Sequence, residues 1–320
     1  MSNQDCDFPK LPQSTRQATP PTATPTDRLV PDYVNWLQNH RGLAETTIAQ
    51  YKRRLMRLLP VLGFDPATYN ASLIRRFIIE EAERCSPSVI NETIKALRGY
   101  LKFLVAHGVC QPGIEGAVPA VAQWRLSSLP LYLLPTDVEK LIMTCDLTTP
   151  VGIRDHAILL LLARLGLRNG DILTMCLSDI DWDGGTLMVC GKGRREVRLP
   201  LPQDAGDALL SYLTEARPHT GNTRVFLTSC APFRPFKYTS NVSSVVNRGL
   251  KRAGITNAPS RGATLLRHSA ATAMLRSGAT LDAIGVVLRH RSVNTTAHYA
   301  KVDFPTLKKV VQPWPGDESC

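Results

Sequence analysis

The stretch "LLRHSAATAMLRSGATLDAIGVVLRHRSVNTTAHYA", residues 265–300, indicates the kind of fold that this chain adopts. Apolar residues recur in it at helical spacing, and Gly278 and the polar residues at 292–296 interrupt the runs. We therefore expect three short helices in succession. The stretch also carries His290 and, nine residues later, Tyr299. Such a pair is most often structural, so its meaning depends on what the rest of the chain brings to it.

Four helical segments are expected at residues 28–110, where they form a small helical domain. The segment at 44–63 places its apolar residues on one face: Ile48, Tyr51, Leu55, Leu58 and Leu62. Its polar face carries four cations, which would either bind a DNA backbone or simply face solvent: Lys52, Arg53, Arg54 and Arg57. The segment at 86–108 begins with Ser86 and Pro87 and ends at Gly108, as helices commonly do.

The rest of the chain divides into a linker, a second domain and two tails. Residues 1–27 are rich in Pro, Thr and Gln, which predicts disorder, and residues 305–320 form a second tail. Residues 111–130 lack a strong period and are interpreted as the linker. The second domain spans 131–304; Thr136 and Glu139 suggest a capping box at its start, and two β-rich runs at 186–201 predict a hairpin. The predicted fold is mainly α with a small antiparallel β-sheet.

The composition favours a polyanionic partner. The formal net charge is +11, of which residues 1–127 contribute +4 and residues 128–320 contribute +7. Basic surfaces bind nucleic acid because neutralised phosphates release counterions. The eight cysteines form no close pair that would suggest a zinc site. The start of the chain lacks a secretory signal, and its longest apolar run, "AILLLLA", is too short for a membrane span, so we expect a cytoplasmic protein.

The chain contains the residue types that would break a DNA phosphodiester without a metal ion. That reaction needs a nucleophile, cations that neutralise the phosphorane oxygens, and an acid for the leaving 5′ oxygen. Arginine suits the second task through its planar fork, and a desolvated lysine suits the third. The candidates, in chain order, are Arg168, Lys192 at the tip of the hairpin, Arg267, His290 and Tyr299.

In these residues the sequence resembles the tyrosine recombinase (phage integrase) family. "RDHAILLLLARLGLRNGDILTMCLSDIDW", residues 154–182, is similar to the first arginine box of that family, and residues 265–300 are similar to the second. The order Arg, Lys, Arg, His, Tyr, the lysine in the hairpin and the His–Tyr spacing all match. The helical segments at 28–110 likewise resemble the core-binding domain of that family. The resemblance implies a C-shaped clamp of this domain and an α+β catalytic domain around duplex DNA.

The resemblance also implies a role for each matching residue. Tyr299 would be the nucleophile that forms a 3′-phosphotyrosine, and Arg168 and Arg267 would hold the scissile phosphate. Lys192 would be the general acid, and His290 would hydrogen-bond a phosphate oxygen. A further acidic residue, Asp171, would support the site from behind. No metal ion or nucleotide cofactor is implied.

Two positions depart from the family pattern. Thr264 stands where the family usually has a histidine, and a threonine hydroxyl is a poor general base. Deprotonation of Tyr299 would then fall to water or to the electrostatic effect of the arginines, and slower chemistry is expected. Arg289 stands where the family has a small glycine and would add a phosphate contact. His268 is interpreted as a structural neighbour of Arg267.

Three functions remain open from the sequence. The first is a site-specific DNA recombinase or integrase of a mobile element, acting on double-stranded DNA as a homo- or hetero-tetramer, with or without partner recombinases. The second is a homologue that binds DNA but has lost catalysis, with Thr264 as the first sign. The third is a tyrosine-using topoisomerase. A covalent protein–DNA adduct would separate the second function from the others, and strand exchange between two sites would separate the third from the first.

Overall fold

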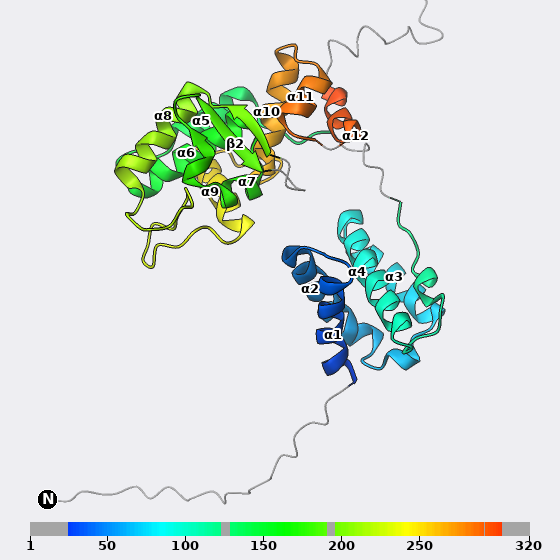
Figure 1. Cartoon of the computed structure of the whole chain (residues 1–320). Coiled ribbons are helices and arrows are strands. Elements are labelled where there is room, and N and C mark those ends of the chain that lie inside the picture. The colour runs from blue at the N-terminus through cyan, green and yellow to red at the C-terminus, as the bar shows by residue number, and fades with distance from the viewer. Residues whose placement is uncertain (1–24, 123–128, 191–195, 291, 303–320) are drawn as a thin grey trace, which may run out of the picture. The chain divides into compact units, whose positions relative to one another are not determined.

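The computed structural model describes residues 25–122, 129–190, 196–290 and 292–302, and these form two compact units. The first unit lies within Met1–Trp124 and the second within Arg125–Cys320 (Figure 1). The described residues are mainly helical, with one three-stranded antiparallel sheet in the second unit. The predicted fold class is therefore confirmed. In this described part, no helix is both long enough and apolar enough to cross a membrane.

The first unit consists of helices packed around α4. Its elements, blue to cyan in Figure 1, are α1 (Pro25–Asn39), α2 (Glu45–Leu62), η1 (Pro66–Thr68), α3 (Ala71–Arg84), α4 (Pro87–Ala106) and η2 (Ile114–Ala117). Helix α4 supplies the largest share of the core, including Tyr100 and Phe103, which are fully buried. The four predicted helical segments are present.

Helix α2 shows how the apolar pattern places the cations outside. Its buried residues are Ile48, Leu55, Leu58, Leu59 and Leu62, and Tyr51 is half-buried. Because side chains three and four positions apart share a helix face, the basic residues between them are turned away from the core. Lys52, Arg53 and Arg57 are exposed and Arg54 is half-buried.

Part of the segment expected to be a linker packs on the first unit. Residues Ile114–Ala117 form a short 3-10 helix, and Val118 is 2% exposed within the core of that unit. The guanidinium of Arg98 on α4 donates to the carbonyl oxygen of Val118 at 2.8 Å. Apolar contacts and this hydrogen bond hold this part of the predicted linker against the first unit, although its sequence shows no helical period.

The second unit is built around a buried helix, α6. In chain order its elements are α5 (Pro135–Met143), α6 (Pro150–Leu165), α7 (Asn169–Thr174), η3 (Leu177–Asp179), β1 (Ile180–Asp181), β2 (Thr186–Cys190), β3 (Glu196–Pro200), α8 (Gln203–Ser211), η4 (Tyr212–Ala216), α9 (Thr239–Arg252), α10 (Thr264–Arg276), α11 (Leu281–Val287), α12 (Val293–Thr296) and η5 (Ala297–Val302). Eleven of the sixteen residues of α6 are buried, so it has no single apolar stripe.

The predicted hairpin is present as β2 and β3. The two strands are antiparallel, with Cys190 opposite Glu196 and Thr186 opposite Pro200. Strand β1 pairs with the other edge of β2, giving the order β1-β2-β3. β1 has only two residues, too few for an alternating pattern in the sequence, and it was not predicted.

The predicted capping box at Thr136 was wrong. Helix α5 begins at Pro135, with Leu134 as its N-cap and no side-chain cap. Proline fixes its own φ near the helical value and favours the first helical position, so it moves the start one residue earlier than the Thr–Glu pattern suggests. Glu139 instead accepts two hydrogen bonds from Arg164 of α6, at 2.5 and 3.0 Å.

Candidate active site

The two arginines of the predicted phosphate clamp meet at one backbone carbonyl. The Nη2 group of Arg168, at the N-cap of α7, donates to the carbonyl oxygen of Leu288 at 3.2 Å and to that of Arg289 at 2.7 Å. Arg267, on α10, donates to the same Leu288 oxygen and to the carbonyl oxygen of Gly166. Residues that are 99 positions apart in the sequence thus lie side by side at the end of α11.

Gly166 makes this close approach possible. It ends α6 in the left-handed conformation, with φ of 57°, which strongly favours glycine. A Cβ atom on Gly166 would lie 2.6 Å from Cδ2 of Leu288, closer than atoms can pack. Glycine here therefore lets Arg267 and the turn after α11 close on the end of α6.

Asp171 joins Arg168 to the residue before His290. Its Oδ2 atom accepts the backbone N–H of Arg168 at 2.7 Å and the Nη2 group of Arg289 at 2.5 Å. The side chains of Asp171 and Arg289 are each 5% exposed. The remaining guanidinium nitrogens of Arg289, Nε and Nη1, are buried and have no hydrogen-bond partner among the described residues.

Arg289 adopts a backbone conformation that an arginine rarely takes. Its φ is 55°, the left-handed region in which the Cβ atom crowds the following carbonyl, at a cost on the order of 1 kcal/mol. Among the described residues it is the only one other than glycine with a positive φ. The family resemblance predicted glycine at this position, and the φ value supplies the reason.

His290 is held by a buried threonine that the sequence did not single out. Its Nδ1 atom lies 2.8 Å from Oγ1 of Thr296, which is 2% exposed. Burial first, and then the nearby arginines Arg267 and Arg168, lower the pKa of His290 to about 4. The imidazole is therefore neutral near pH 7. If the Thr296 hydroxyl donates to Nδ1, then Nε2 carries the ring proton and can donate it.

Tyr299 lies beside both histidines of the site. Its hydroxyl oxygen is 2.7 Å from Nδ1 of His268, and its ring stacks on that of His290 with centroids 6.3 Å apart. Tyr299 is 2% exposed, and burial raises its pKa to about 12. Arg267 acts in the opposite direction and favours the phenolate.

His268 contacts the predicted nucleophile as well, which its interpretation as a structural neighbour of Arg267 did not include. On a helix, consecutive side chains project about 100° apart, so His268 leaves α10 on a different side from Arg267 and contacts η5. The signal in the sequence was its position four residues after Thr264, which places both residues on one face. Only Thr264 on that face was considered as a possible base.

The site combines a net positive charge with burial. Three guanidinium groups, those of Arg168, Arg267 and Arg289, lie near a single carboxylate, that of Asp171. Burial first, and then the charges of Arg168 and Arg289, lower the pKa of Arg267 to about 10. Like charges held together in a buried place favour an anion, and phosphate oxygens match the arginine fork. Among the described residues no cluster of three or more metal-ligating side chains occurs.

One predicted site residue lies outside the described residues, and another stands apart from this group. Lys192 lies outside the described residues, in the connection between β2 and β3. Thr264 is the first residue of α10 and is exposed. The structure therefore brings together Arg168, Asp171, Arg267, His290 and Tyr299.

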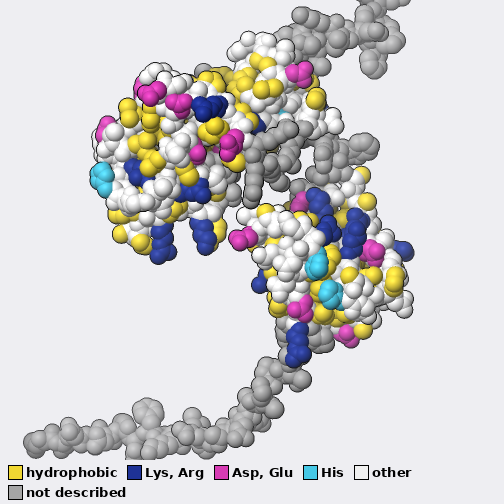
Figure 2. All heavy atoms as spheres, in the orientation of Figure 1, with side chains coloured by type: hydrophobic (Ala, Val, Ile, Leu, Met, Phe, Trp, Pro, Cys, Tyr) yellow, Lys and Arg dark blue, Asp and Glu magenta, His cyan; other side chains and the backbone are white. Residues whose placement is uncertain are grey.

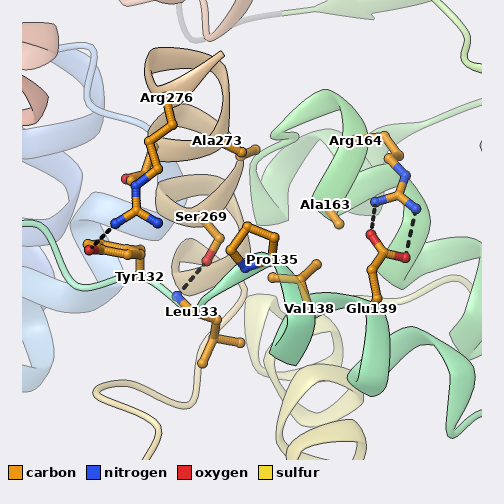
Figure 3. A pocket seen from close by; sticks show the side chains of 12 residues that line it. Tyr132, Leu133, Pro135, Val138, Glu139, Ala163, Arg164, Ser269, Ala273 and Arg276 are labelled. Atoms are coloured by element: carbon orange, nitrogen blue, oxygen red, sulfur yellow. Dashed lines mark hydrogen bonds and ion pairs between the residues drawn. The ribbon is translucent and has the colours of Figure 1, made fainter. Parts of the chain in front are cut away.

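A pocket on another side of α10 has different chemistry (Figure 3). It lies between α5, α6 and α10, and several of the polar groups that line it are paired with one another, whereas Oγ1 of Thr272 has no partner among the described residues. Arg276 donates to the hydroxyl of Tyr132 at 2.7 Å, and the backbone N–H of Leu133 donates to Oγ of Ser269 at 2.8 Å. None of the predicted catalytic residues lines it. The pocket is therefore not the candidate reaction site.

The predicted DNA-binding residues form a basic surface on the first unit. Lys and Arg side chains are visible on this unit in Figure 2. Within the described part of the chain, no ion pair neutralises Lys52, Arg53, Arg54 or Arg57. By contrast, Arg76 and Lys95 of the same unit pair with Glu80 and Glu92.

The chain combines a helical unit, a second unit with a small sheet, and a buried tyrosine among arginines. This combination is typical of the enzymes that cut and rejoin DNA through an active-site tyrosine. The chain belongs to the phage integrase family: the family model matches residues 132–305, and the model of the family's N-terminal SAM-like domain matches residues 30–108.

Curated relatives carry the same kind of name. The chain is 41% identical over 290 residues to y4rA, a candidate integrase/recombinase of Sinorhizobium fredii, covering 89% of this chain and 70% of that protein. It is 31% identical over 295 residues to the tyrosine recombinase XerD of Listeria monocytogenes, covering 88% of this chain and 96% of that one.

Solved structures show the same fold at low sequence identity. The XerH site-specific recombinase bound to its palindromic difH substrate aligns with a TM-score of 0.68 and 18% identity, over 88% of this chain and 83% of that one. A lambda integrase dimer bound to a COC′ core site aligns with a TM-score of 0.66 and 17% identity, over 85% and 94% of the two chains.

Proposed function

We propose that this member of the phage integrase family is a site-specific recombinase that cuts and rejoins double-stranded DNA through a 3′-phosphotyrosine at Tyr299. The observation that carries the proposal is the meeting of Arg168, Arg267, His290 and Tyr299 in one buried, positively charged place. These four residues come from three separate parts of the sequence.

Each residue has a task in the proposed reaction. Arg168 and Arg267 exchange the Leu288 carbonyl for the non-bridging oxygens of the phosphate, which carry more charge. His290, neutral and held by Thr296, donates from Nε2 to a phosphate oxygen. Tyr299 attacks phosphorus, and Lys192 protonates the 5′ oxygen as it leaves. Asp171 keeps Arg168 in place through its backbone N–H.

The first unit supplies affinity for the duplex in this proposal. The cations of α2, which form no ion pair with any described residue, contact phosphates and leave the choice of site to other residues. Both units carry net positive charge, which fits a shared DNA partner.

The biological setting is proposed as that of a mobile element. Identity to the Sinorhizobium integrase/recombinase, 41%, is higher than to the Listeria XerD, 31%. Solved relatives include a lambda integrase dimer bound to a core site and a lambda integrase tetramer bound to a Holliday junction. We extend that assembly to this chain as a tetramer on two DNA sites, formed with copies of itself or with partner recombinases.

The test is covalent capture on a suicide substrate. Binding sites are first selected from the DNA that flanks the gene, and the best duplex is nicked so that cleavage releases a short strand and traps the intermediate. We expect a denaturation-resistant adduct from the native chain and none from Tyr299→Phe, which keeps the ring and loses one oxygen. An adduct formed by Tyr299→Phe would assign the nucleophile to another residue, and no adduct from the native chain would favour a DNA-binding homologue without activity.

A further inference from the structure

The hydroxyl of Tyr299 already has a partner that is able to take its proton. Nδ1 of His268, on α10, lies 2.7 Å from Oη of Tyr299, on η5, and the ring centroids are 5.6 Å apart. A phenol has one proton to donate, and a neutral imidazole has one nitrogen to accept it. The contact therefore joins the reacting oxygen to a base.

The ionisation of the two groups allows Tyr299 to donate in this hydrogen bond. Burial lowers the pKa of His268 and raises that of Tyr299 to about 12, so both groups are neutral near pH 7. In the tautomer of His268 that carries its ring proton on Nε2, Tyr299 donates and Nδ1 of His268 accepts. This is the arrangement that a general base adopts before the reaction.

Burial and then the charged surroundings keep His268 unprotonated until an anion arrives. Arg267, its neighbour on α10, disfavours the imidazolium, as does His298 on η5. His290, which follows α11, faces the same cluster, and Lys301 of η5 acts on His298. A phosphodiester bound by the arginines would offset these cations, so the proton affinity of His268 rises when substrate is in place.

The position of His268 answers the departure at Thr264. Both residues lie on α10, four positions apart, and so project from the same face one helical turn from each other. Thr264 is exposed and has a hydroxyl, which is a poor base, whereas His268 is half-buried and touches the nucleophile. This face of α10 therefore lacks a base at its first turn, where Thr264 lies, but has one a turn later, at His268.

We propose that His268 is the catalytic proton acceptor for Tyr299, an inference that rests on the proposed attack by this tyrosine. As Oη forms its bond to phosphorus, the O–H bond breaks and the proton passes to Nδ1, giving an imidazolium. The bond from phosphorus to the 5′ oxygen breaks, and that oxygen receives a proton from the general acid, assigned to Lys192. On rejoining, the 5′ oxygen bonds to phosphorus and gives its proton back to the general acid, and the imidazolium returns its proton to Oη as the phenol leaves.

A competing role for the same contact is a latch. Tyr299 is 2% exposed, so a hydrogen bond to His268 could hold the hydroxyl away from DNA. The two roles predict opposite effects when His268 is replaced, because loss of a base slows cleavage and loss of a latch speeds it.

The experiment is single-turnover cleavage of the nicked suicide duplex across pH 5–8 by His268→Gln. Glutamine can still hydrogen-bond Tyr299 but does not accept a proton. We expect cleavage to fall about 100-fold or more, the range of general-base assistance, with unchanged DNA affinity. The rise of the native rate with pH, as His268 loses its proton, should disappear. His298→Gln is the matched control, since its ring lies beside Tyr299 edge-on at 6.0 Å, and it should keep the pH-dependent rise.

A modified substrate separates the base from the acid. With sulfur in place of the 5′ bridging oxygen, the leaving group departs without a proton, so a variant of the general acid recovers its rate. His268→Gln should remain slow on this substrate. Recovery on the sulfur substrate, or native or faster cleavage of the ordinary duplex by His268→Gln, overturns the assignment. Failure of the proposed function looks different, because Tyr299→Phe would then still form the adduct or the native chain would form none.

Discussion

The guanidinium of Arg289 lies 2.5 Å from the carboxylate of Asp171, and both side chains are 5% exposed. This position is unfavourable for Arg289 in two ways. Its backbone is left-handed, with φ of 55°, and two of its buried guanidinium nitrogens lack a hydrogen-bond partner among the described residues. The same carboxylate oxygen holds the backbone of Arg168, so the pair connects the start of α7 to the residue before His290.

We predict that Asp171→Asn destabilises the second unit by about 3 kcal/mol or more, because it leaves the buried charge of Arg289 uncompensated. Arg289→Gly should cost less, since glycine relieves the left-handed strain and Asp171 keeps the N–H of Arg168. In the double variant the two losses should fall short of their sum by at least about 1 kcal/mol. Hydrogen exchange of the α7 amides measures these free energies locally, and strict additivity would show that the pair is not coupled.

Replacement of the clamp arginines by lysine should slow cleavage while the charge stays. Arg267 uses two guanidinium nitrogens on two carbonyl oxygens, a geometry that one ammonium cannot reproduce. Loss of such a donor in the transition state typically costs about 100-fold or more. Single-turnover cleavage by Arg168→Lys and Arg267→Lys tests this, with Arg164→Lys as a control, because Arg164 pairs with Glu139 and Asp204 instead. Near-native rates in both clamp variants would show that Arg168 and Arg267 do not hold the phosphate in the transition state.

The cations of α2 should contribute to the salt dependence of DNA binding. If Lys52 and Arg57 contact phosphates, the double variant Lys52→Gln/Arg57→Gln should reduce the slope of log affinity against log salt by about 1.8, roughly 0.9 per contact. The loss should be equal for specific and unrelated duplexes. Arg76→Gln/Lys95→Gln removes the same charge from residues that are already paired with Glu80 and Glu92, and should change the slope little. Equal slopes in the two double variants would show that Lys52 and Arg57 face solvent and do not contact phosphates.

Much of the fold could be predicted from the sequence because its signals are local. The apolar spacing of α2, the Ser86–Pro87 start of α4 and the β2–β3 hairpin all depend on neighbouring residues. What failed was also local but competed with a stronger signal: Pro135 determined the start of α5 over Thr136. Strand β1 exists only through its pairing with β2.

The site could be predicted only as a set of residue types. The order of Arg168, Arg267, His290 and Tyr299 was visible, yet their contacts depend on how far-apart segments pack. No sequence pattern says that Thr296 reaches His290, and the position of His268 four residues after Thr264 indicates its helix face but not its contact with Tyr299. Both contacts require α10, α11 and η5 to be folded together.

His290 should make the stability of the second unit depend on pH. Its pKa is about 4 in the folded chain and about 6.5 when unfolded, so the unfolded chain binds a proton first as the pH falls. The neutral imidazole of His290 contributes fully to the free energy of unfolding above pH 6.5. This contribution is lost as the pH falls toward 4. Because the ring is half-buried and partly screened, we expect about 1 kcal/mol at pH 5. The fall in Tm between pH 7 and pH 5 should be smaller in His290→Gln than in the native chain, and an equal fall would contradict the buried neutral state.

Introducing the family's histidine by Thr264→His should change the cleavage rate by less than about threefold, far below the roughly 10²–10⁴-fold that general-base assistance usually supplies. The single proton of Tyr299 already goes to His268 at 2.7 Å, so a second imidazole at an exposed position has nothing to accept. The effect should be larger in His268→Gln, where the new side chain lies one turn away on the same face of α10 and restores part of the lost rate. Single-turnover rates across pH for the native chain, the two single variants and the double variant form a closed cycle. If Thr264→His alone accelerates cleavage about 100-fold with a rise near pH 6.5, the native site lacks a working base, and His268 does not fill that role.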